Sequence, residues 1–315
     1  MQVRSVQMAP GPAGRAARVH AFAAPEPWTH MDLPTETATS DSADPAHTTG
    51  TSIVSATHRR PGVWSGFGIV ALYFLLQFGL SMLIGAAIGF VLALKAGIEA
   101  AVHHQHPDAK AIVLTMRANP DIRVVLTVLT IATAAVVMVL IVRQFWRAQW
   151  SRSELPGFGF VQPADKSAYL VAVLLGVGVL LLGGGITHLL AGHHQVHQDV
   201  TMLAGKVSLG MRLLLALLVV GVAPFVEELV FRGVLLSGLA SRMRVGWAIV
   251  VSAIIFGCVH LPDFKFAWYP VPALVLLGLA LGWMRVRSGS LWPSITLHAT
   301  NNFLAMLAWF VTAHH

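Results

Sequence analysis

The sequence has few charged residues and almost no cysteine. Asp, Glu, Lys and Arg make up 11% of the 315 residues, whereas hydrophobic residues make up 56%. An ordinary soluble domain is about 25% charged, so this composition predicts a polytopic membrane protein. The one cysteine, Cys258, excludes an intrachain disulfide and a cysteine metal cluster. Its place in an apolar run predicts a small buried side chain.

Several common catalytic and binding signatures are also missing. The chain has no Gly-rich phosphate loop, no Gly-x-Ser-x-Gly elbow, no His-Glu-x-x-His and no heptad repeat. The formal charge of +7 would suggest nucleic acid in a soluble protein. Here most Lys and Arg residues lie between apolar segments, so we interpret them as topology determinants facing anionic lipid. We therefore expect the lipid bilayer, and no nucleic acid, as a partner.

The first sixty residues differ in composition from the rest of the chain. Residues 1–60 are rich in Ala, Pro, Ser, Thr and His and show no sustained hydrophobic periodicity. Such a segment buries too little apolar surface to offset chain entropy, so we predict a disordered polar tail. Residues 61–315 form the predicted transmembrane domain.

Apolar segments follow the tail and predict an all-α, polytopic membrane helical bundle with about seven transmembrane helices. Each segment is compared with the roughly 20 residues that cross a hydrocarbon core. The predicted segments are Trp64–Leu94, Val124–Val142, Ala168–Ala191, Leu209–Phe231, Trp247–His260, Val271–Met284 and Leu291–Val311. The fifth and sixth are short for a full crossing. Gly85-x-x-x-Gly89 and Gly278-x-x-x-Gly282 have a spacing that permits close helix approach.

Basic residues alternate between the loops and predict the orientation. They are Arg59 and Arg60 before the first segment, Arg143, Arg147, Arg152 and Lys166 after the second, Arg242 and Arg244 after the fourth, and Arg285 and Arg287 after the sixth. The positive-inside rule places the N-terminus in the cytoplasm and the C-terminus outside. Ala, Gly and Arg usage favours a bacterial inner (plasma) membrane. The loop Gln144–Gln162 predicts either an interfacial amphipathic segment or an aromatic belt with positive anchors.

Two adjacent carboxylates interrupt the fourth apolar segment. A carboxylate near the bilayer centre costs roughly 2.5–3.5 kcal/mol on insertion scales, so such residues usually face the protein interior and have a function. On a helix Glu228 and Arg232 are i and i+4 and can pair. Glu227 is rotated by about 100° and is left for another partner. The predicted helix places both glutamates near its cytoplasmic end.

Polar side chains also interrupt the fifth and seventh segments. Phe256 and His260, and likewise His298 and Asn302, have the i, i+4 spacing that puts both members of a pair on one helical face. Peptide hydrolysis needs water activation, oxyanion stabilisation and protonation of the leaving amine. Glu227 fits a general base, and His298 with Asn302 supplies N–H donors that suit an oxyanion site.

Taken in chain order, Glu-Glu-x-x-x-Arg, Phe-x-x-x-His and His-x-x-x-Asn resemble the CPBP family of intramembrane proteases. This family includes type II CAAX prenyl endopeptidases and bacteriocin-processing or bacteriocin-immunity proteins. The resemblance covers about residues 209–310 and implies a protease core whose cavity opens toward the cytoplasm. It implies Glu227 and His260 as the water-activating pair, His298 and Asn302 as the oxyanion site, and a membrane-anchored or lipidated peptide or protein as substrate.

Two questions stay open at this level. Glu227, His260 and His298 form a chemically plausible zinc set, two imidazoles and a carboxylate with an open position. We favour a metal-free glutamate mechanism and expect no cofactor, because Asn302 is a poor zinc ligand but a good oxyanion donor. A catalytically silent immunity or assembly factor would use the same polar residues to hold helices together. A proton-coupled transporter would use them as a relay, although the sequence shows no inverted repeat.

Overall fold

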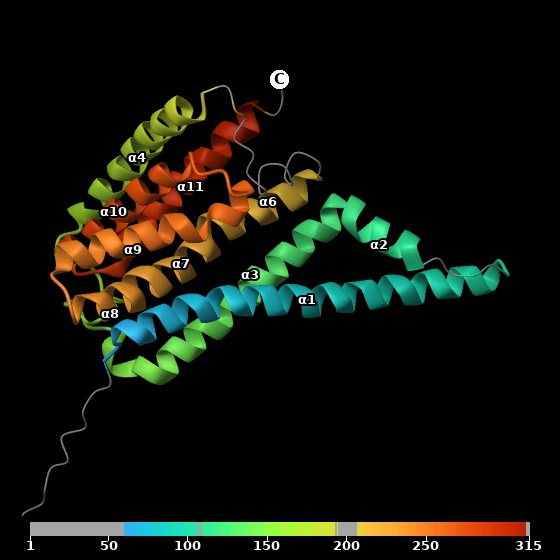
Figure 1. Ribbon diagram of the computed structural model, residues 1–315, viewed down its shortest axis with the longest axis horizontal. Coiled ribbons are helices and arrows are strands. Elements are labelled where there is room, and N and C mark those ends of the chain that lie inside the picture. The colour runs from blue at the N-terminus through green and yellow to red at the C-terminus, as the bar shows by residue number, and fades with distance from the viewer. Residues whose placement is uncertain (1–59, 105, 107–108, 193, 195–206, 313–315) are drawn as a thin grey trace, which may run out of the picture. The chain divides into compact units, whose positions relative to one another are not determined.

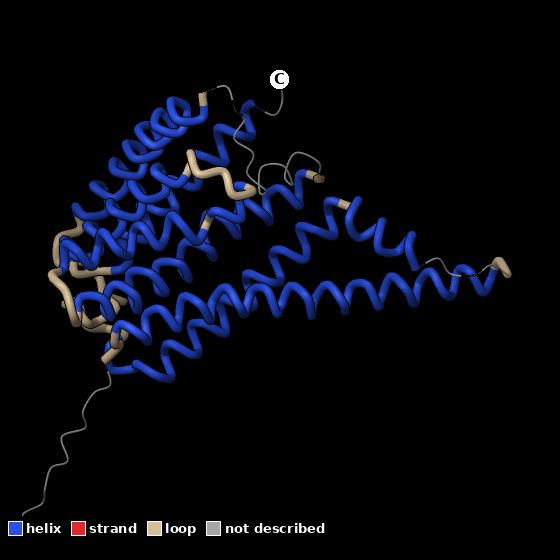
Figure 2. The backbone as a smooth tube through the Cα atoms, in the orientation of Figure 1, coloured by secondary structure: helices blue, strands red, loops and turns tan. Residues whose placement is uncertain are grey.

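A computed structural model of the chain describes residues 60–104, 106, 109–192, 194 and 207–312. All regular secondary structure in this part of the chain is helical, as Figure 2 shows. This confirms the all-α prediction. Residues 1–59, which make up nearly all of the predicted tail, lie outside the described residues.

The helices pack against one another in a bundle (Figure 1). They are α1 (Val63–Val102), α2 (Ala109–Ala118), α3 (Pro120–Trp146), α4 (Ser167–Ala191), α6 (Leu209–Leu217), α7 (Ala223–Glu228), α8 (Leu236–Ala240), α9 (Val245–Val259), α10 (Val271–Ser288) and α11 (Leu291–Thr312). Two π-helical turns, Leu218–Val222 and Leu229–Leu235, join α6, α7 and α8 into one helix. Short 3-10 turns cover Arg147–Gln149 and Leu261–Phe264.

Five helices in the described residues are long and apolar enough to cross a membrane. They are Val63–Val102, Pro120–Gln149, Ser167–Ala191, Leu209–Ala240 and Val271–Ser288. The chain is thus an integral membrane protein. The other two predicted spans are also helices: α9 has only 15 residues, or about 22 Å, and α11 carries several polar residues along its length.

The first helix is longer than predicted. Hydropathy placed its end at Leu94, but α1 has 40 residues and continues to Val102. At 1.5 Å per residue it is about 60 Å long, twice the thickness of a hydrocarbon core. The continuation carries Lys95 and Glu99, whose side chains approach to 3.9 Å. The predicted membrane span ended at Leu94 because the charged residues that follow are unfavourable in hydrocarbon. The helix itself continues, because an i, i+4 ion pair is compatible with helical structure.

Many apolar side chains point outward rather than into the bundle. Leu75, Phe78 and Phe90 on α1 are exposed, as expected for a surface that faces lipid. Cys258 on α9 is exposed as well, so its predicted burial is wrong. In a membrane protein an apolar side chain is favourable on either face of a helix, and an apolar run therefore does not indicate burial.

Close packing of α9 against α10 depends on glycine. A Cβ added at Gly278 would lie 2.8 Å from the Ala253 Cα, and one at Gly282 would lie 2.9 Å from Ile249 Cγ2. The predicted close approach at this Gly-x-x-x-Gly pair is confirmed. At Gly85 on α1 an added Cβ would meet nothing within 4 Å, whereas one at Gly89 would lie 3.2 Å from Met116 Sδ on α2, so only the second glycine of that pair makes a close approach.

The loop between α3 and α4 folds back on the bundle. Phe158 is buried, and Trp150 stacks on Phe160 with ring centroids 4.1 Å apart. Arg285 of α10 donates hydrogen bonds to the carbonyls of Ser153 (2.9 Å) and Gly157 (2.6 Å). Neither predicted alternative for this loop, an interfacial segment or a simple aromatic belt, describes a packed connection of this kind.

A carboxylate lies just before the start of helix α4. The Asp165 carboxylate accepts hydrogen bonds from the hydroxyl and the backbone N–H of Ser167. These bonds hold the pKa of Asp165 below its usual range. Asp165 thus bonds to the first residue of the helix that lies against α10 and α11.

Most of the predicted topology-determining residues meet at one end of the bundle, which we call the arginine-rich end. It comprises the start of α1, the end of α3, the start of α4, the α8–α9 turn and the end of α10, with Arg60, Arg147, Arg152, Lys166, Arg242, Arg244 and Arg287 (Figure 1).

Glu227 lies thirteen residues before the end of α8 at Ala240, or about 20 Å from that end. The glutamate pair is therefore near mid-helix, and its predicted place at the end of the helix is wrong because the helix continues beyond Phe231.

Candidate active site

The buried carboxylate of Glu228 is the centre of a hydrogen-bonded network. Its side chain is 0% exposed. Oε1 accepts from Arg232 Nη1 and from His298 Nδ1, both at 3.0 Å, and Oε2 accepts from Ser294 Oγ at 2.6 Å. A buried charge is tolerated when it is paired and hydrogen-bonded in this way. The predicted i, i+4 pairing of Glu228 with Arg232 is confirmed.

The Arg232 guanidinium is held from several sides. Its side chain is 1% exposed. Nη2 donates to the Gly278 carbonyl of α10 at 3.3 Å, and the guanidinium lies 4.4 Å from the centre of the Phe256 ring on α9. This cation–π contact gives Phe256 a role that its motif alone did not reveal. Arg232 thus contacts α9 and α10 as well as the Glu228 carboxylate on its own helix.

Glu227 lies on another side of the same helix. Its side chain keeps 15% exposure, and Oε2 lies 3.8 Å from His298 Nε2. His298 therefore stands between the two glutamates, with Nδ1 donating to Glu228 and Nε2 directed toward Glu227. One carboxylate is fully engaged in structure, whereas the other is accessible and has spare acceptor capacity.

The π-helical turns on both sides of α7 place this pair. In Leu218–Val222 the backbone N–H of Ala223 bonds to the Leu218 carbonyl, and after Leu229–Leu235 the N–H of Leu236 bonds to the Phe231 carbonyl. Such i, i+5 turns are rare and occur frequently at functional sites. They rotate the side chains relative to an ideal α-helix, so the sequence periodicity does not give their directions.

His260 ends α9 and has a carboxylate partner of its own. Its Nδ1 lies 2.8 Å from Asp263 Oδ2, and its side chain is 20% exposed. The Phe256 ring contacts both histidines edge to face, with centroids 5.0 Å from His260 and 5.7 Å from His298. The structure thus brings both predicted histidines to one aromatic ring, although the polar partner of His260 is Asp263 rather than Glu227.

Asn302 lies one turn beyond His298 on α11 and contacts the first π turn. Its Nδ2 donates to the Val219 carbonyl at 3.0 Å, and its Oδ1 accepts from Asn301 Nδ2 at 3.3 Å. In the i, i+5 register the donor for Val219 would come from Pro224, which has no N–H. The amide of Asn302 supplies it, and its second hydrogen is available for another acceptor.

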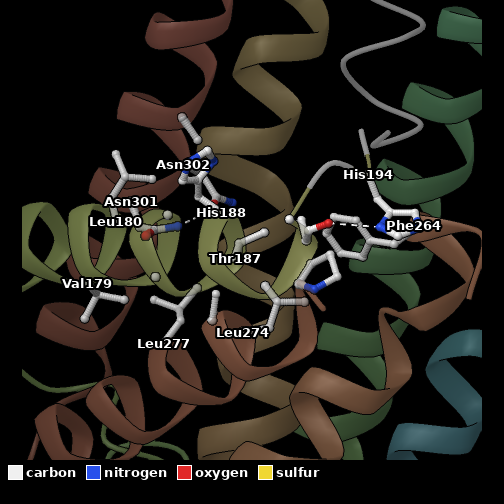
Figure 3. Close-up of a pocket in the computed structure, with 17 residues that line it drawn as sticks. Val179, Leu180, Thr187, His188, His194, Phe264, Leu274, Leu277, Asn301 and Asn302 are labelled. Atoms are coloured by element: carbon white, nitrogen blue, oxygen red, sulfur yellow. Dashed lines mark hydrogen bonds between the residues drawn. The ribbon is translucent and has the colours of Figure 1, made fainter. Parts of the chain in front are cut away.

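A cavity of about 520 Å³ reaches α11 from between α4 and α10 (Figure 3). Its walls are largely apolar, with Leu180, Leu274 and Leu277. They also carry Thr187, His188 and His194, and Asn301 and Asn302 line the cavity from α11. His298 is not among its lining residues, so of the predicted His298–Asn302 pair only Asn302 faces this cavity. The lining also includes the last turns of α4 and the first of α10, which lie away from the arginine-rich end.

Glu227, His260 and His298, the alternative zinc set, do not converge in the described part of the chain. There, no group of three His, Cys, Asp or Glu side chains is arranged to hold a metal ion. His298 Nδ1 is engaged by Glu228, and His260 Nδ1 by Asp263. The donors as placed do not fit a three-ligand zinc centre.

Two members of the site were not found from the sequence. Ser294 bonds to Glu228, and Asp263 bonds to His260. A signal for Ser294 was present, because Ser294, His298 and Asn302 repeat every four residues and share one helical face. Asp263 follows His260 by three residues, but it lies in a 3-10 turn that hydropathy does not indicate.

The fold and the site together define a membrane-embedded helical protein whose core contains a buried Glu-Arg-Ser-His network beside an accessible glutamate. Residues 209–304 match the family model described as Type II CAAX prenyl endopeptidase Rce1-like, which is a protease family. The match confirms the family resemblance that the three motifs predicted, over α6 to α11. No curated protein and no solved structure matches the chain.

Proposed function

We propose that the protein is an intramembrane endopeptidase that uses Glu227 to activate water and cleaves a membrane-anchored or lipidated peptide or protein. The observation that carries the proposal is the division of labour between the two glutamates. Glu228 accepts hydrogen bonds from Arg232, Ser294 and His298. Glu227 is partly exposed, and its carboxylate faces His298 Nε2. A purely structural cluster would need only a buried glutamate that is hydrogen-bonded as Glu228 is.

In the proposed reaction Glu227 takes a proton from water as the water oxygen attacks the scissile carbonyl carbon. The carbonyl π electrons move to oxygen and form a tetrahedral oxyanion. When the C–N bond breaks, its electron pair stays on nitrogen, which takes up the proton from Glu227, directly or through His260. The products are a carboxylic acid and an amine. Glu227 is regenerated, and no oxidant or cofactor is consumed.

His298 has a defined protonation requirement in this scheme. Its Nδ1 donates to Glu228, so a neutral ring would present an unprotonated Nε2 toward Glu227. Donation from Nε2 to an oxyanion requires both ring nitrogens to carry a proton. We therefore propose that the imidazolium form of His298 stabilises the oxyanion, while Glu228 fixes the orientation of the ring.

Asn302 supplies the second donor of the proposed oxyanion site. One of its amide hydrogens is used by Val219, so the amide is anchored against the π turn. In the proposed site the other hydrogen bonds to the oxyanion. Preorganised donors of this kind are worth roughly 2.7–4 kcal/mol each. The apolar cavity beside Asn302 is suited to a substrate segment that carries apolar groups.

The test is cleavage of a membrane-anchored reporter peptide by protein reconstituted in lipid vesicles. Glu227→Gln, His260→Ala and His298→Ala are each expected to abolish cleavage while the helical circular dichroism stays unchanged. Glu99→Gln, which changes an exposed glutamate on α1, is the matched control and retains full activity. Wild-type rates in Glu227→Gln would refute the protease assignment.

A silent membrane scaffold is the second candidate. It is favoured by one observation: Arg232, Ser294 and Asn302 each satisfy a buried carboxylate or carbonyl and need no substrate. A scaffold predicts that loss of Glu227 changes neither stability nor any cleavage. The protease predicts loss of cleavage with stability retained, because the Glu227 side chain is partly exposed and approaches His298 Nε2 only to 3.8 Å.

A further inference from the structure

The second histidine of the site has a carboxylate neighbour that none of the three motifs contains. Asp263 lies in the 3-10 turn Leu261–Phe264 directly after α9. Its Oδ2 is 2.8 Å from His260 Nδ1. The backbone N–H of Asp263 also donates to the His260 carbonyl at 3.0 Å. The two side chains are therefore brought together by a fixed local turn.

This contact selects one form of the imidazole. A carboxylate accepts hydrogen bonds, so the neutral His260 ring carries its proton on Nδ1, and Nε2 is left as an acceptor. Phe256 packs against the ring edge to face and limits its rotation. His260 is thus held in one tautomer and one orientation by a carboxylate and an aromatic ring.

The same arrangement occurs a second time in the site. Glu228 engages Nδ1 of His298, just as Asp263 engages Nδ1 of His260. The two imidazoles meet the same Phe256 ring. Each therefore has its Nδ1 occupied and its Nε2 left for another partner. The burial differs: the Glu228 side chain is fully buried, whereas that of Asp263 is 55% exposed, so Asp263 contributes little to packing.

We infer that Asp263 is a positioning residue that keeps His260 in the Nδ1-protonated tautomer, with Nε2 available to exchange the proton that Glu227 takes from water. The inference rests on the proposed peptidase activity. It assigns Asp263 no contact with substrate, because its effect passes through the imidazole. Orienting carboxylates of this type contribute at least tenfold to the rate in comparable histidine sites.

The kinetic test compares Asp263→Ala, Asp263→Glu and the control Glu99→Gln in the reconstituted cleavage assay. Asp263→Ala is expected to lower kcat at least tenfold with KM changed less than twofold, because the change affects proton transfer and not binding. Asp263→Glu, which keeps a carboxylate, is expected to recover most of this loss. Equal denaturation midpoints for the variants exclude a folding defect. Wild-type kcat in Asp263→Ala, alongside an inactive Glu227→Gln, overturns the inference and leaves the proposed function standing.

A second readout does not depend on activity. In histidine-labelled protein at a pH where the ring is neutral, ¹⁵N shifts distinguish the two tautomers, and His260→Gln identifies the His260 signals. The wild type is expected to show the Nδ1-protonated form, and Asp263→Ala a mixture. An Nε2-protonated His260 in the wild type refutes the positioning role. Absence of cleavage in every variant, with the expected tautomer present, refutes the peptidase and not the Asp263 contact.

Discussion

Replacing Arg232 by methionine should destabilise the protein far more than replacing an exposed arginine. Methionine keeps much of the side-chain volume but removes the charge that neutralises Glu228. At their 3.0 Å separation, the two charges attract by about 5.5 kcal/mol for an effective dielectric constant of 20. Breaking such a fully buried pair by removing one partner typically costs about 3–5 kcal/mol, because the remaining charge cannot reach water.

The measurement is reversible denaturant unfolding in mixed micelles, carried out as a double-mutant cycle. Arg232→Met is expected to lower the unfolding free energy by about 3–5 kcal/mol. Adding Glu228→Gln removes the uncompensated charge and should restore at least half of the loss, because the amide still accepts from Ser294. The exposed Arg242→Met is the control and should change stability by less than about 0.5 kcal/mol. A loss below about 1 kcal/mol in Arg232→Met, or additive losses in the double variant, would contradict the pairing as the source of stability.

Three further predictions concern packing, orientation and metal. Gly278→Ala should cost about 1–3 kcal/mol of stability, because its Cβ would lie 2.8 Å from Ala253 Cα; Gly85→Ala, where nothing lies within 4 Å, should be neutral or stabilising, and equal effects would disprove the packing explanation. In intact cells, with Cys258 replaced by serine, a membrane-impermeant thiol reagent should label His103→Cys from outside and leave Arg242→Cys unlabelled; the reverse pattern would invert the predicted topology. Cleavage should continue in a chelated, metal-free preparation, and inactivation that zinc reverses would establish a metalloprotease.

The labelling result also decides between two expectations that disagree. The positive-inside rule places the arginine-rich end in the cytoplasm, so the cavity beside Asn302 would open on the other side. The family resemblance implies a cavity that opens toward the cytoplasm. The structure places the cavity between the last turns of α4 and the first of α10, and neither loop charge nor motif spacing indicates that position.

Sequence reasoning located the helices well where hydropathy changes sharply. It predicted α4 to within one residue, because the apolar run there is bounded by Asp165 and Lys166 at one end and by Gly192 at the other. It ended α1 and the Glu-Glu helix too early, because a charge or an arginine inside a helix lowers hydropathy without ending the backbone hydrogen bonding. It did not indicate α2.

The candidate site was also predictable only in part. The i, i+4 geometry of a helix fixes the pairing of Glu228 with Arg232 locally, and that pairing was predictable. The partners from other helices, Ser294 and the Gly278 carbonyl, depend on how α10 and α11 pack, which local spacing does not specify. The separation of roles between Glu227 and Glu228 depends on the π turns, which no hydrophobic period reveals.

By itself, the sequence determined that this is a helical membrane protein with carboxylate, arginine and imidazole groups inside apolar spans, because burying such groups in lipid is costly and their order forms a recognisable pattern. Only the tertiary structure decided which carboxylate is buried and which meets water, and that Asp263 stands behind His260. The burial of Glu228 depends on partners from another helix, and in a bilayer the apolar faces that set helix packing resemble the faces that meet lipid. The contact of Asp263 with His260 depends on a 3-10 turn that hydropathy does not indicate.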